Sequence, residues 1–433
     1  MRAGGSRALR AVVALQLVAL VVLAGVTVSR FRVWADIDER PHYDYVQKLA
    51  EEQRLPRPTD LVSPEVQAIT DRTWPRPSPT DPAAIGQAGR SFEAIQPPLY
   101  YAAATPAFLA VSDHRDKVFA VRVFDAVLLL LTALLLWRLA RRMAEPAAAL
   151  AGLSAALLVL LWPGVVVRGV TIGNTPLELG LTAAFLLALW RADGDTRGRP
   201  MLLAAVLLGL CLLTKLTLVL LVPLFLLVLV RRSRAGAPPR QWALAAVPPL
   251  LLAPWLALNL DRYGSPTVNG EGTPGVAGPV QTAGTLDRVR ALPRPTARLL
   301  DGVLPQEWIV QLDVWWVRAV VDLLAVGLIV AGVAALALGR REWRGWFLAL
   351  PMAGGLGLLA GVYVLTGSDI FLLRYIYPAL PPLALAAGIG LARGGVTRVH
   401  VAGLLAVTLL LGAVWVDLAG FFWFNNVGAK LGI

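Results

Sequence analysis

Apolar stretches of about twenty residues recur along the whole 433-residue sequence. Each is long enough to cross roughly 30 Å of hydrocarbon as an α-helix. Lipid offers the backbone no hydrogen-bond partners, so spanning segments must be helices rather than open sheets. The sequence therefore predicts an all-α polytopic membrane protein, one transmembrane domain over residues 1–433. About eleven spans are expected, at residues 9–29, 118–140, 147–167, 176–191, 200–214, 216–231, 242–260, 314–339, 345–366, 374–392 and 399–423.

Composition supports this class. Hydrophobic residues make up 57% of the chain, charged residues only 16%, and the mean hydropathy is +0.64. A soluble protein of this length could not bury so much apolar surface. The net charge of +12 would suggest nucleic acid in a soluble protein, but the arginines cluster at the ends of the apolar stretches. That pattern is typical of topology signals and headgroup contacts, so we expect membrane lipids and no nucleic acid as partners.

Short arginine-rich connections give the expected orientation. The positive-inside rule places them in the cytoplasm together with the N-terminus, at residues 2–10, 138–142, 191–199, 231–240, 340–344 and 393–398. Two long loops, residues 30–112 and 261–312, are then extracytoplasmic. The first apolar stretch is longer than a usual signal-peptide core, which favours an uncleaved anchor in the plasma membrane.

The apolar run at residues 200–231 has basic residues at both ends. As one helix it would be about 48 Å long, too long for the bilayer, with Lys215 near the middle. A lysine at the bilayer centre is unfavourable by roughly 2.5–3.5 kcal/mol. We therefore predict a hairpin of two short helices that meet near Thr214 and Lys215, with the lysine towards the outer face.

The densest group of acidic residues follows the first span. Residues 34–56 read WADIDERPHYDYVQKLAEEQRLP and contain Asp36, Asp38, Glu39, Asp44, Glu51 and Glu52, with His42 and Tyr43 among them. Two interpretations stay open. The acids cap a helix and keep the loop solvated, or one of them is a general base that takes a proton from an incoming hydroxyl.

The spacing after Pro41 is helical. Tyr45, Lys48 and Leu49 recur at i, i+3 and i+4, which predicts one face of a helix lying on the membrane surface. Carboxylates just before it would occupy the N-cap position, where the helix dipole stabilises them. The stretch QPPLYYAAATPAFLA at residues 96–110 is apolar but too short to span, so we expect it at the interface.

Five segments in order resemble the membrane-embedded GT-C glycosyltransferases. They are DERPHYDYVQKLAEEQRLP after the first span, QPPLYY at 96–101, GLCLLTKLTLVLLVP at 209–223, NLDRYGSP at 259–266 and LRYIYPALPPLAL at 373–385. The likeness is to the dolichyl-phosphate-mannose protein mannosyltransferase-like and aminoarabinose transferase-like branch, which includes the Rgt-like bacterial enzymes. It covers about residues 10–390.

The resemblance implies a GT-C fold and transfer of a sugar from a polyprenyl-phosphate carrier to an acceptor on the outer side of the membrane. It implies that the first loop carries the catalytic aspartate. Asp38 would be the general base, Glu39 and His42 would position the base or the acceptor, and Asp36 is the fallback. The lipid phosphate leaving group needs positive charge rather than a strong acid.

Candidate substrate-binding residues follow from the same motifs. Lys215 and Arg374 are the best candidates for the phosphate, and Arg168 and Arg122 also fall near outer ends of spans. For each cation the alternative is snorkelling to the headgroups. The remaining expected substrate contacts are His42, Tyr43, Gln96, Tyr100 and Tyr375.

The sequence also departs from the family pattern. Many relatives have an acidic residue after the third helix, whereas here TIGNTPLE at 171–178 has Asn174 followed by Thr175, with Glu178 nearby. The only histidines are His42, His114 and His400, and the lone cysteine is Cys211. We therefore expect no cofactor and no obligatory metal.

Three functional hypotheses remain at this point. The first is a polyprenyl-phosphate-sugar-dependent glycosyltransferase whose acceptor is a glycan, a protein or a lipid. The second is a transporter or flippase for lipid-linked sugars, for which mid-span charges and inverted repeats would be expected. The third is a catalytically inactive GT-C-like scaffold that binds the carrier. The gathering of acidic residues in an outer loop favours the first.

Overall fold

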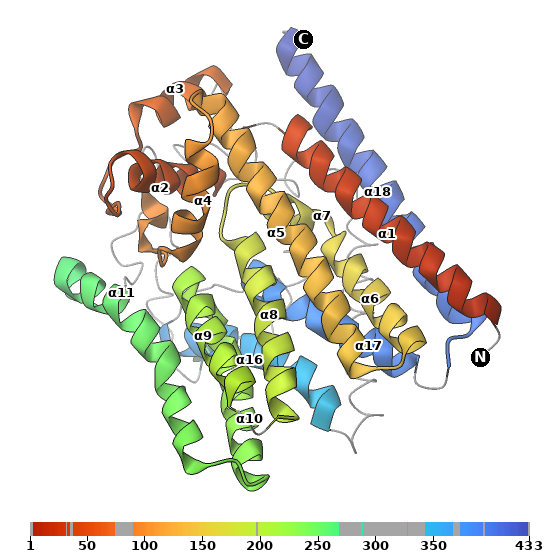
Figure 1. The fold of residues 1–433 in the computed structure, drawn as a ribbon. Helices are drawn as coiled ribbons and strands as arrows, with labels where there is room; N and C mark the ends of the chain where they lie inside the picture. The colour runs from red at the N-terminus through yellow and green to blue at the C-terminus, as the bar shows by residue number, and fades with distance from the viewer. Residues whose placement is uncertain are drawn as a thin grey trace.

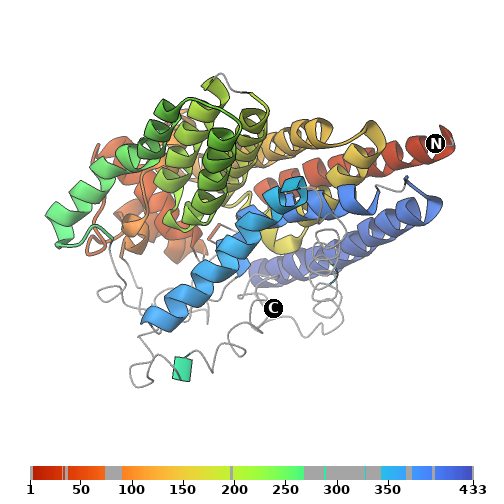
Figure 2. The same ribbon diagram turned by 90° about the horizontal axis from the view of Figure 1, so that it is seen from below.

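The computed structural model describes residues 3–31, 33–34, 38–73, 90–195, 198–267, 287–288, 327, 343–366, 373–392 and 395–431. Within these ranges the regular structure is helical, and an isolated antiparallel bridge joins Leu61 to Arg90 (Figures 1 and 2). The predicted span at 314–339 and most of the predicted loop at 261–312 lie outside the described residues.

Two groups of helices make up the described structure. The bundle contains α1 (Ala3–Arg30), α5 (His114–Met143), α6 (Pro146–Leu160), α7 (Pro163–Arg168), α8 (Thr175–Asp193), α9 (Arg199–Thr214), η2 (Leu216–Leu221), α10 (Val222–Arg234), η3 (Pro239–Ala246), α11 (Val247–Tyr263), α16 (Trp343–Thr366), η6 (Leu373–Ala379), α17 (Leu380–Leu391) and α18 (Arg398–Leu431). The first loop contributes α2 (Glu39–Glu51), α3 (Pro64–Thr73), η1 (Phe92–Ile95) and α4 (Leu99–Leu109).

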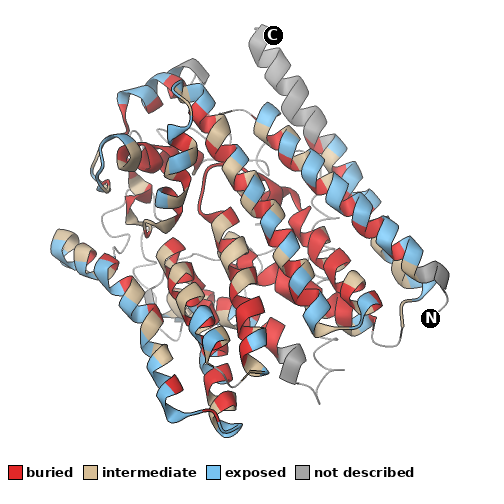
Figure 3. Ribbon diagram, in the orientation of Figure 1, coloured by how far each residue is buried: buried red, intermediate tan, exposed pale blue. Residues whose placement is uncertain are grey.

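Several helices are long and apolar enough to cross a membrane. Among the described residues there are six such segments, Ser6–Arg30, His114–Met143, Leu216–Arg234, Pro239–Tyr263, Phe347–Leu365 and Arg398–Val416. The helices α6 and α9 are apolar but shorter. Exposed side chains of α1 include Leu15, Val18, Val21 and Val22, and the exposed face is visible along α1 in Figure 3. Apolar side chains facing outward from a bundle indicate a lipid-facing surface.

The predicted span at 147–167 is divided into two helices. The helix α6 ends at Leu160, and α7 begins at Pro163 after a turn. Proline has no amide hydrogen with which to continue a helix, so it is well placed at the start of the next one. The consequence is that the last residue of α7, Arg168, lies next to the first loop rather than at the end of a straight helix.

The predicted hairpin at residues 200–231 is present. The helix α9 ends at Thr214, Lys215 is extended, and η2 with α10 runs back along the bundle. At the return end, Arg232 Nη1 donates to the carbonyl oxygens of Ala192 and Asp195, just before α9 begins. Lys215 is therefore at the opposite end of the hairpin from Arg232.

The helices α6 and α17 pack at close range. A Cβ added to Gly388 would lie 2.6 Å from the carbonyl oxygen of Ala151, and one added to Gly152 would lie 2.7 Å from the side chain of Ile389. Small residues allow such backbone approach, which is how helices commonly associate in lipid.

The first loop forms a small layer on one end of the bundle (Figure 1). Its core is aromatic, and Tyr45 stacks on Tyr101 with ring centroids 3.6 Å apart. Two residues of the face predicted to contact the membrane surface, Tyr45 and Lys48, are instead buried within the loop. Lys48 Nζ donates to Asp44 at 2.7 Å and to the Leu61 carbonyl at 2.6 Å, so the loop folds over this helix.

Candidate active site

Asp38 lies at the N-cap position of α2, but its carboxylate makes no capping hydrogen bond. Its Oδ2 instead accepts hydrogen bonds from Nη1 of Arg168 at 3.1 Å and from Nη1 of Arg374 at 2.5 Å. Arg168 ends α7 and Arg374 lies in η6, so three distant parts of the sequence meet at one carboxylate. All three side chains stay partly accessible.

Lys215 adds a third cation at the tip of the α9–α10 hairpin. Its Nζ donates to Glu178 Oε1 at 2.8 Å and to Asn174 Oδ1 at 3.4 Å. Asn174 precedes α8 and Glu178 lies in its first turn. Lys215 Nζ and the guanidinium carbon of Arg374 also lie 5.5 and 5.4 Å from the ring centroid of Tyr375. The aromatic face between them is a favourable site for both cations.

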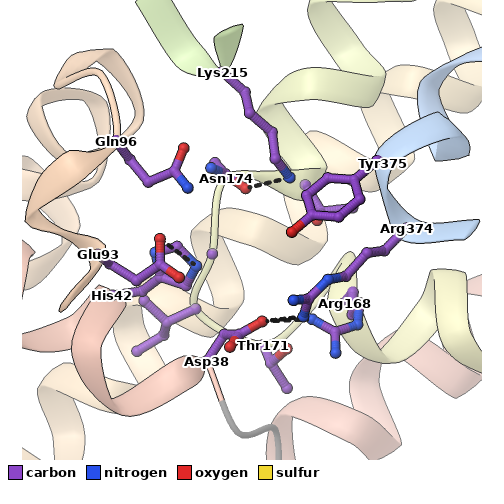
Figure 4. A pocket seen from close by; sticks show the side chains of 13 residues that line it. Asp38, His42, Glu93, Gln96, Arg168, Thr171, Asn174, Lys215, Arg374 and Tyr375 are labelled. Atoms are coloured by element: carbon purple, nitrogen blue, oxygen red, sulfur yellow. Dashed lines mark hydrogen bonds and ion pairs between the residues drawn. The ribbon is translucent and has the colours of Figure 1, made fainter. Parts of the chain in front are cut away.

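These groups line one cavity (Figure 4). It opens to solvent, and the empty space within it and at its mouth is about 450 Å³. Its lining residues are Asp38, His42, Glu93, Gln96, Arg168, Thr171, Ile172, Gly173, Asn174, Thr175, Lys215, Arg374 and Tyr375. The cavity thus lies between the first loop, the segment before α8, the hairpin tip and η6.

A second carboxyl group, that of Glu93 in η1, faces the cavity near His42 (Figure 4). Glu93 is only 8% exposed, and among the described residues its Oε2 has no hydrogen-bond partner. His42 Nε2 lies 4.0 Å from that oxygen. The other ring nitrogen of His42 lies 2.8 Å from the hydroxyl oxygen of Tyr101, which fixes the orientation of the ring.

The two carboxyl groups titrate in opposite directions. Burial by itself raises the pKa of Asp38, but Arg374, Arg168 and His42 outweigh it and hold this pKa well below its ordinary value. Burial and, after it, the charge of Asp38 raise the pKa of Glu93, while Arg374, Lys215 and a hydrogen bond with Gln96 lower it, and the net pKa is about 7. Near neutral pH, one group is an anion and the other exchanges its proton readily.

Glu39 supports the cavity from behind. It has no exposed surface and forms a two-point ion pair with Arg122, with Nε and Nη2 each 2.6 Å from a carboxylate oxygen. It also accepts hydrogen bonds from the backbone amides of Trp34 and Ile172, at 2.9 and 3.3 Å. Because Glu39 follows Asp38 directly, these bonds fix where Asp38 sits relative to the segment before α8.

Tyr100 is the second buried support. Its hydroxyl donates to Asp125 at 2.8 Å and accepts from the amide of Gly173 at 3.0 Å. Gly173 is itself in close contact with His42, since a Cβ there would lie 3.3 Å from the imidazole Cδ2. The segment at residues 171–174 is therefore held by α4 and α5, and its side of the cavity is fixed in shape.

The structure brings many of the candidate residues together and leaves others outside. The predicted residues that line the cavity are Asp38, His42, Gln96, Arg168, Lys215, Arg374 and Tyr375. Glu39 and Tyr100 lie behind it, with Arg122 paired to Glu39 rather than open to the cavity. Tyr43 packs in the aromatic core of the first loop and contacts His114 at 3.2 Å. Asp36 lies outside the described residues.

Sequence reasoning missed Glu93, Thr171, Ile172, Gly173 and Thr175, and noted Asn174 only as a departure from the family pattern. Glu93 lies three residues before Gln96, in a stretch with no helical or strand periodicity to indicate its direction. Its proximity to the QPPLYY segment was the only available signal. No group of three or more histidine, cysteine, aspartate or glutamate side chains in the described ranges is arranged to hold a metal ion.

Comparison with known proteins agrees with this architecture. The sequence matches the family described as "Predicted membrane protein (DUF2142)" over residues 10–383. The chain belongs to this family. No curated protein sequence matches it. The chain is thus a member of a membrane protein family, as its multiple apolar helices indicate.

Solved structures resemble the chain over nearly its whole length. Two are of ArnT from Cupriavidus metallidurans, in the apo state (TM-score 0.55) and bound to undecaprenyl phosphate (TM-score 0.56). Both are 16% identical, with 94% of this chain and 64% of ArnT covered. A third is the archaeal oligosaccharyltransferase AglB from Archaeoglobus fulgidus, with an inhibitory peptide and a dolichol-phosphate (TM-score 0.44, 13% identity, 92% of this chain and 55% of AglB).

The similarity to ArnT identifies the fold, and it confirms the predicted GT-C fold. The chain spans about two thirds of the length of ArnT. Fold similarity by itself does not establish activity, which has to be argued from the chemistry of the cavity.

Proposed function

We propose that this protein is a glycosyltransferase that moves a sugar from a polyprenyl-phosphate carrier to an acceptor hydroxyl, with Asp38 as general base. One observation carries the proposal: within a GT-C fold, a cavity presents the Asp38 carboxylate beside the cations Arg168, Arg374 and Lys215. A base and an anion-binding group within one cavity are what this reaction requires.

The chemistry follows from the charges. The acceptor oxygen attacks the anomeric carbon of the sugar, the bond from that carbon to the phosphate oxygen breaks, and its electron pair leaves with the lipid phosphate. Guanidinium and ammonium groups stabilise this anion, so no acid is needed at that end. The hydroxyl proton passes to Asp38.

The arginines have two roles in this scheme. In the structure they hold Asp38 as an anion. A lipid phosphate entering the cavity competes for the same guanidinium hydrogens, and each hydrogen bond that Asp38 loses increases its affinity for a proton. Binding of the donor thus makes Asp38 a better base at the moment when a base is required.

The proposal includes the orientation of the protein. Arginines end α5, α8 and α10 at the end of the bundle away from the cavity. The positive-inside rule assigns that end and the N-terminus to the cytoplasm, so the cavity opens on the extracytoplasmic face of the plasma membrane. The acceptor is then a glycan, protein or lipid on that face.

Turnover in nanodiscs tests the proposal. The wild type is incubated with a panel of polyprenyl-phosphate sugars, and the release of free polyprenyl phosphate is measured. We expect release with at least one donor and a loss of about 10²–10⁴-fold in Asp38→Asn. Asp71→Asn is the matched control, because Asp71 lies in the same loop but is exposed and accepts a hydrogen bond from Gln67 outside the cavity.

The competing hypotheses give different results in the same assay. A carrier-binding scaffold would retain the polyprenyl phosphate without turnover of any donor. A flippase would move the labelled donor across the bilayer without releasing carrier. Activity of Asp38→Asn equal to that of Asp71→Asn would refute Asp38 as the base.

A further inference from the structure

The buried carboxyl of Glu93 has an oxygen without a hydrogen bond. Oε2 of Glu93 is buried and faces the cavity, and no residue in the described part of the chain forms a hydrogen bond with it. Buried polar atoms are nearly always paired, so an orphan oxygen in a cavity indicates a role with a proton or a ligand. The imidazole of His42 is a titratable neighbour, and its Nε2 lies 4.0 Å from this oxygen.

Asp38 is poorly suited to retain a proton. Its Oδ2 accepts hydrogen bonds from both Arg168 and Arg374, and these cations favour the ionised carboxylate. Once the lipid phosphate has left, the arginines return to Asp38 and expel any proton it has taken. To complete the cycle, this proton has to pass to solvent or to another group in the cavity, and a carboxyl group close by can receive it.

We propose that Glu93 is this second group and holds the proton that sugar transfer releases, receiving it from Asp38 through His42. The inference rests on the proposed function and deepens it. The acceptor O–H bond breaks and its proton goes to Asp38. His42 lies close enough to Asp38 for its charge to act on that carboxylate, and the lone pair of its Nε2 takes the proton from Asp38, forming an imidazolium. Nε2 then gives this proton to Oε2 of Glu93 when the two atoms close from 4.0 Å to hydrogen-bond distance. Asp38 ends as an anion, His42 as a neutral imidazole, and Glu93 as a carboxylic acid that later loses its proton to solvent.

The surroundings of Glu93 suit this role. Asp38 disfavours its ionised form, while Arg374 and Lys215 favour it, and their balance with burial places the pKa of Glu93 at about 7. His42 faces it at 4.0 Å. A carboxyl with this pKa both accepts and releases a proton readily at neutral pH.

Tyr101 is a further titratable group on this side, beyond His42. Burial and the charge of Glu93 raise the pKa of Tyr101 well above its ordinary value. Its hydroxyl therefore stays protonated and acts only as a hydrogen-bond partner of His42. Tyr101 therefore adds nothing to the pH response of the relay near neutral pH.

The test is the pH dependence of turnover in the wild type and in Glu93→Gln. Glu93 must be ionised to receive a proton, so wild-type kcat rises with pH through about 7. In Glu93→Gln we expect kcat to fall by about 10²-fold and this pH dependence to disappear. Glu51→Gln is the matched control: Glu51 lies in the same loop and pairs with Lys117 outside the cavity. Unchanged kcat in Glu93→Gln, or a raised KM alone, would overturn the proposal.

Infrared titration provides a readout that does not depend on turnover. The carboxyl band of Glu93 should titrate near pH 7 in the wild type and be absent in Glu93→Gln, with Glu51→Gln unchanged. An active wild type without this band would refute the role of Glu93 while leaving the transferase intact. An inactive wild type that has the band would refute the transferase and retain the proton site.

Discussion

Substitution of Glu39 by alanine should lower the free energy of unfolding more than the loss of any surface ion pair would. The carboxylate of Glu39 and the guanidinium of Arg122 are both fully buried and joined by two hydrogen bonds of 2.6 Å. Breaking a buried pair leaves the other charge uncompensated, which lowers the free energy of unfolding by about 3–5 kcal/mol. The amides of Trp34 and Ile172 also lose their acceptor, each worth about 1–3 kcal/mol if left unsatisfied.

Water entering the vacated space offsets part of this loss, so we expect a net decrease of about 4–5 kcal/mol. Equilibrium unfolding by SDS in mixed micelles measures it, with fluorescence of the 14 tryptophans as the signal. Glu51→Ala is the control, because the Glu51 side chain is 34% exposed in its pair with Lys117. That pair should contribute no more than about 1 kcal/mol.

A double variant tests the electrostatic explanation directly. Glu39→Ala combined with Arg122→Met removes the orphaned charge and should be more stable than Glu39→Ala alone. The reasoning is refuted if Glu39→Ala loses no more stability than Glu51→Ala. It is also refuted if the double variant is as unstable as the sum of its two single changes.

Three further outcomes can be measured. Gly388→Ala should lower the free energy of unfolding by about 1–3 kcal/mol, because the new Cβ would clash with the backbone of Ala151. Gly403→Ala should raise it by up to about 1 kcal/mol, because a Cβ at that position has no atom within 4 Å. In the folded protein the pKa of Glu93 is raised from 4.5 to about 7, so the folded state binds its proton more tightly than the unfolded state does. As pH rises from 4.5 to 7, the unfolding free energy of the wild type should therefore fall relative to that of Glu93→Gln, by on the order of 3 kcal/mol. Equal pH dependence in both would contradict the assignment. Lys215→Gln should weaken undecaprenyl phosphate binding in nanodiscs by about tenfold or more, whereas Lys117→Gln, outside the cavity, should not.

Much of the bundle follows from the sequence because lipid imposes a simple rule. Apolar length defines a span, so the helices at residues 3–30, 114–143 and 398–431 lie where periodicity and hydropathy predict them. The same rule, with the unfavourable burial of a lysine, predicted the break at Thr214. The rule does not extend to Pro163, where a run that is apolar throughout contains a turn.

The first loop shows where such local rules end. Periodicity predicted the helix that contains Tyr45 and Lys48, but it also predicted that these two side chains face the membrane surface. Which face of a short amphipathic helix is covered depends on what folds over it, and here the segments at residues 61 and 91 supply a carbonyl and a hydroxyl to Lys48. These contacts are 13 and 43 residues distant in sequence.

The sequence by itself determined the membrane class, the helices and most of the charged residues of the cavity, because each is recognisable from its own composition or motif. Tertiary structure alone decided their roles. The adjacent acids Asp38 and Glu39 look equivalent in sequence, yet one faces two arginines across an open cavity and the other is sealed against Arg122. The position of Glu93 in the cavity was likewise decided by the tertiary structure. The chemistry of a carboxyl group is set by its burial and by the charges around it, and those come from segments up to 336 residues away.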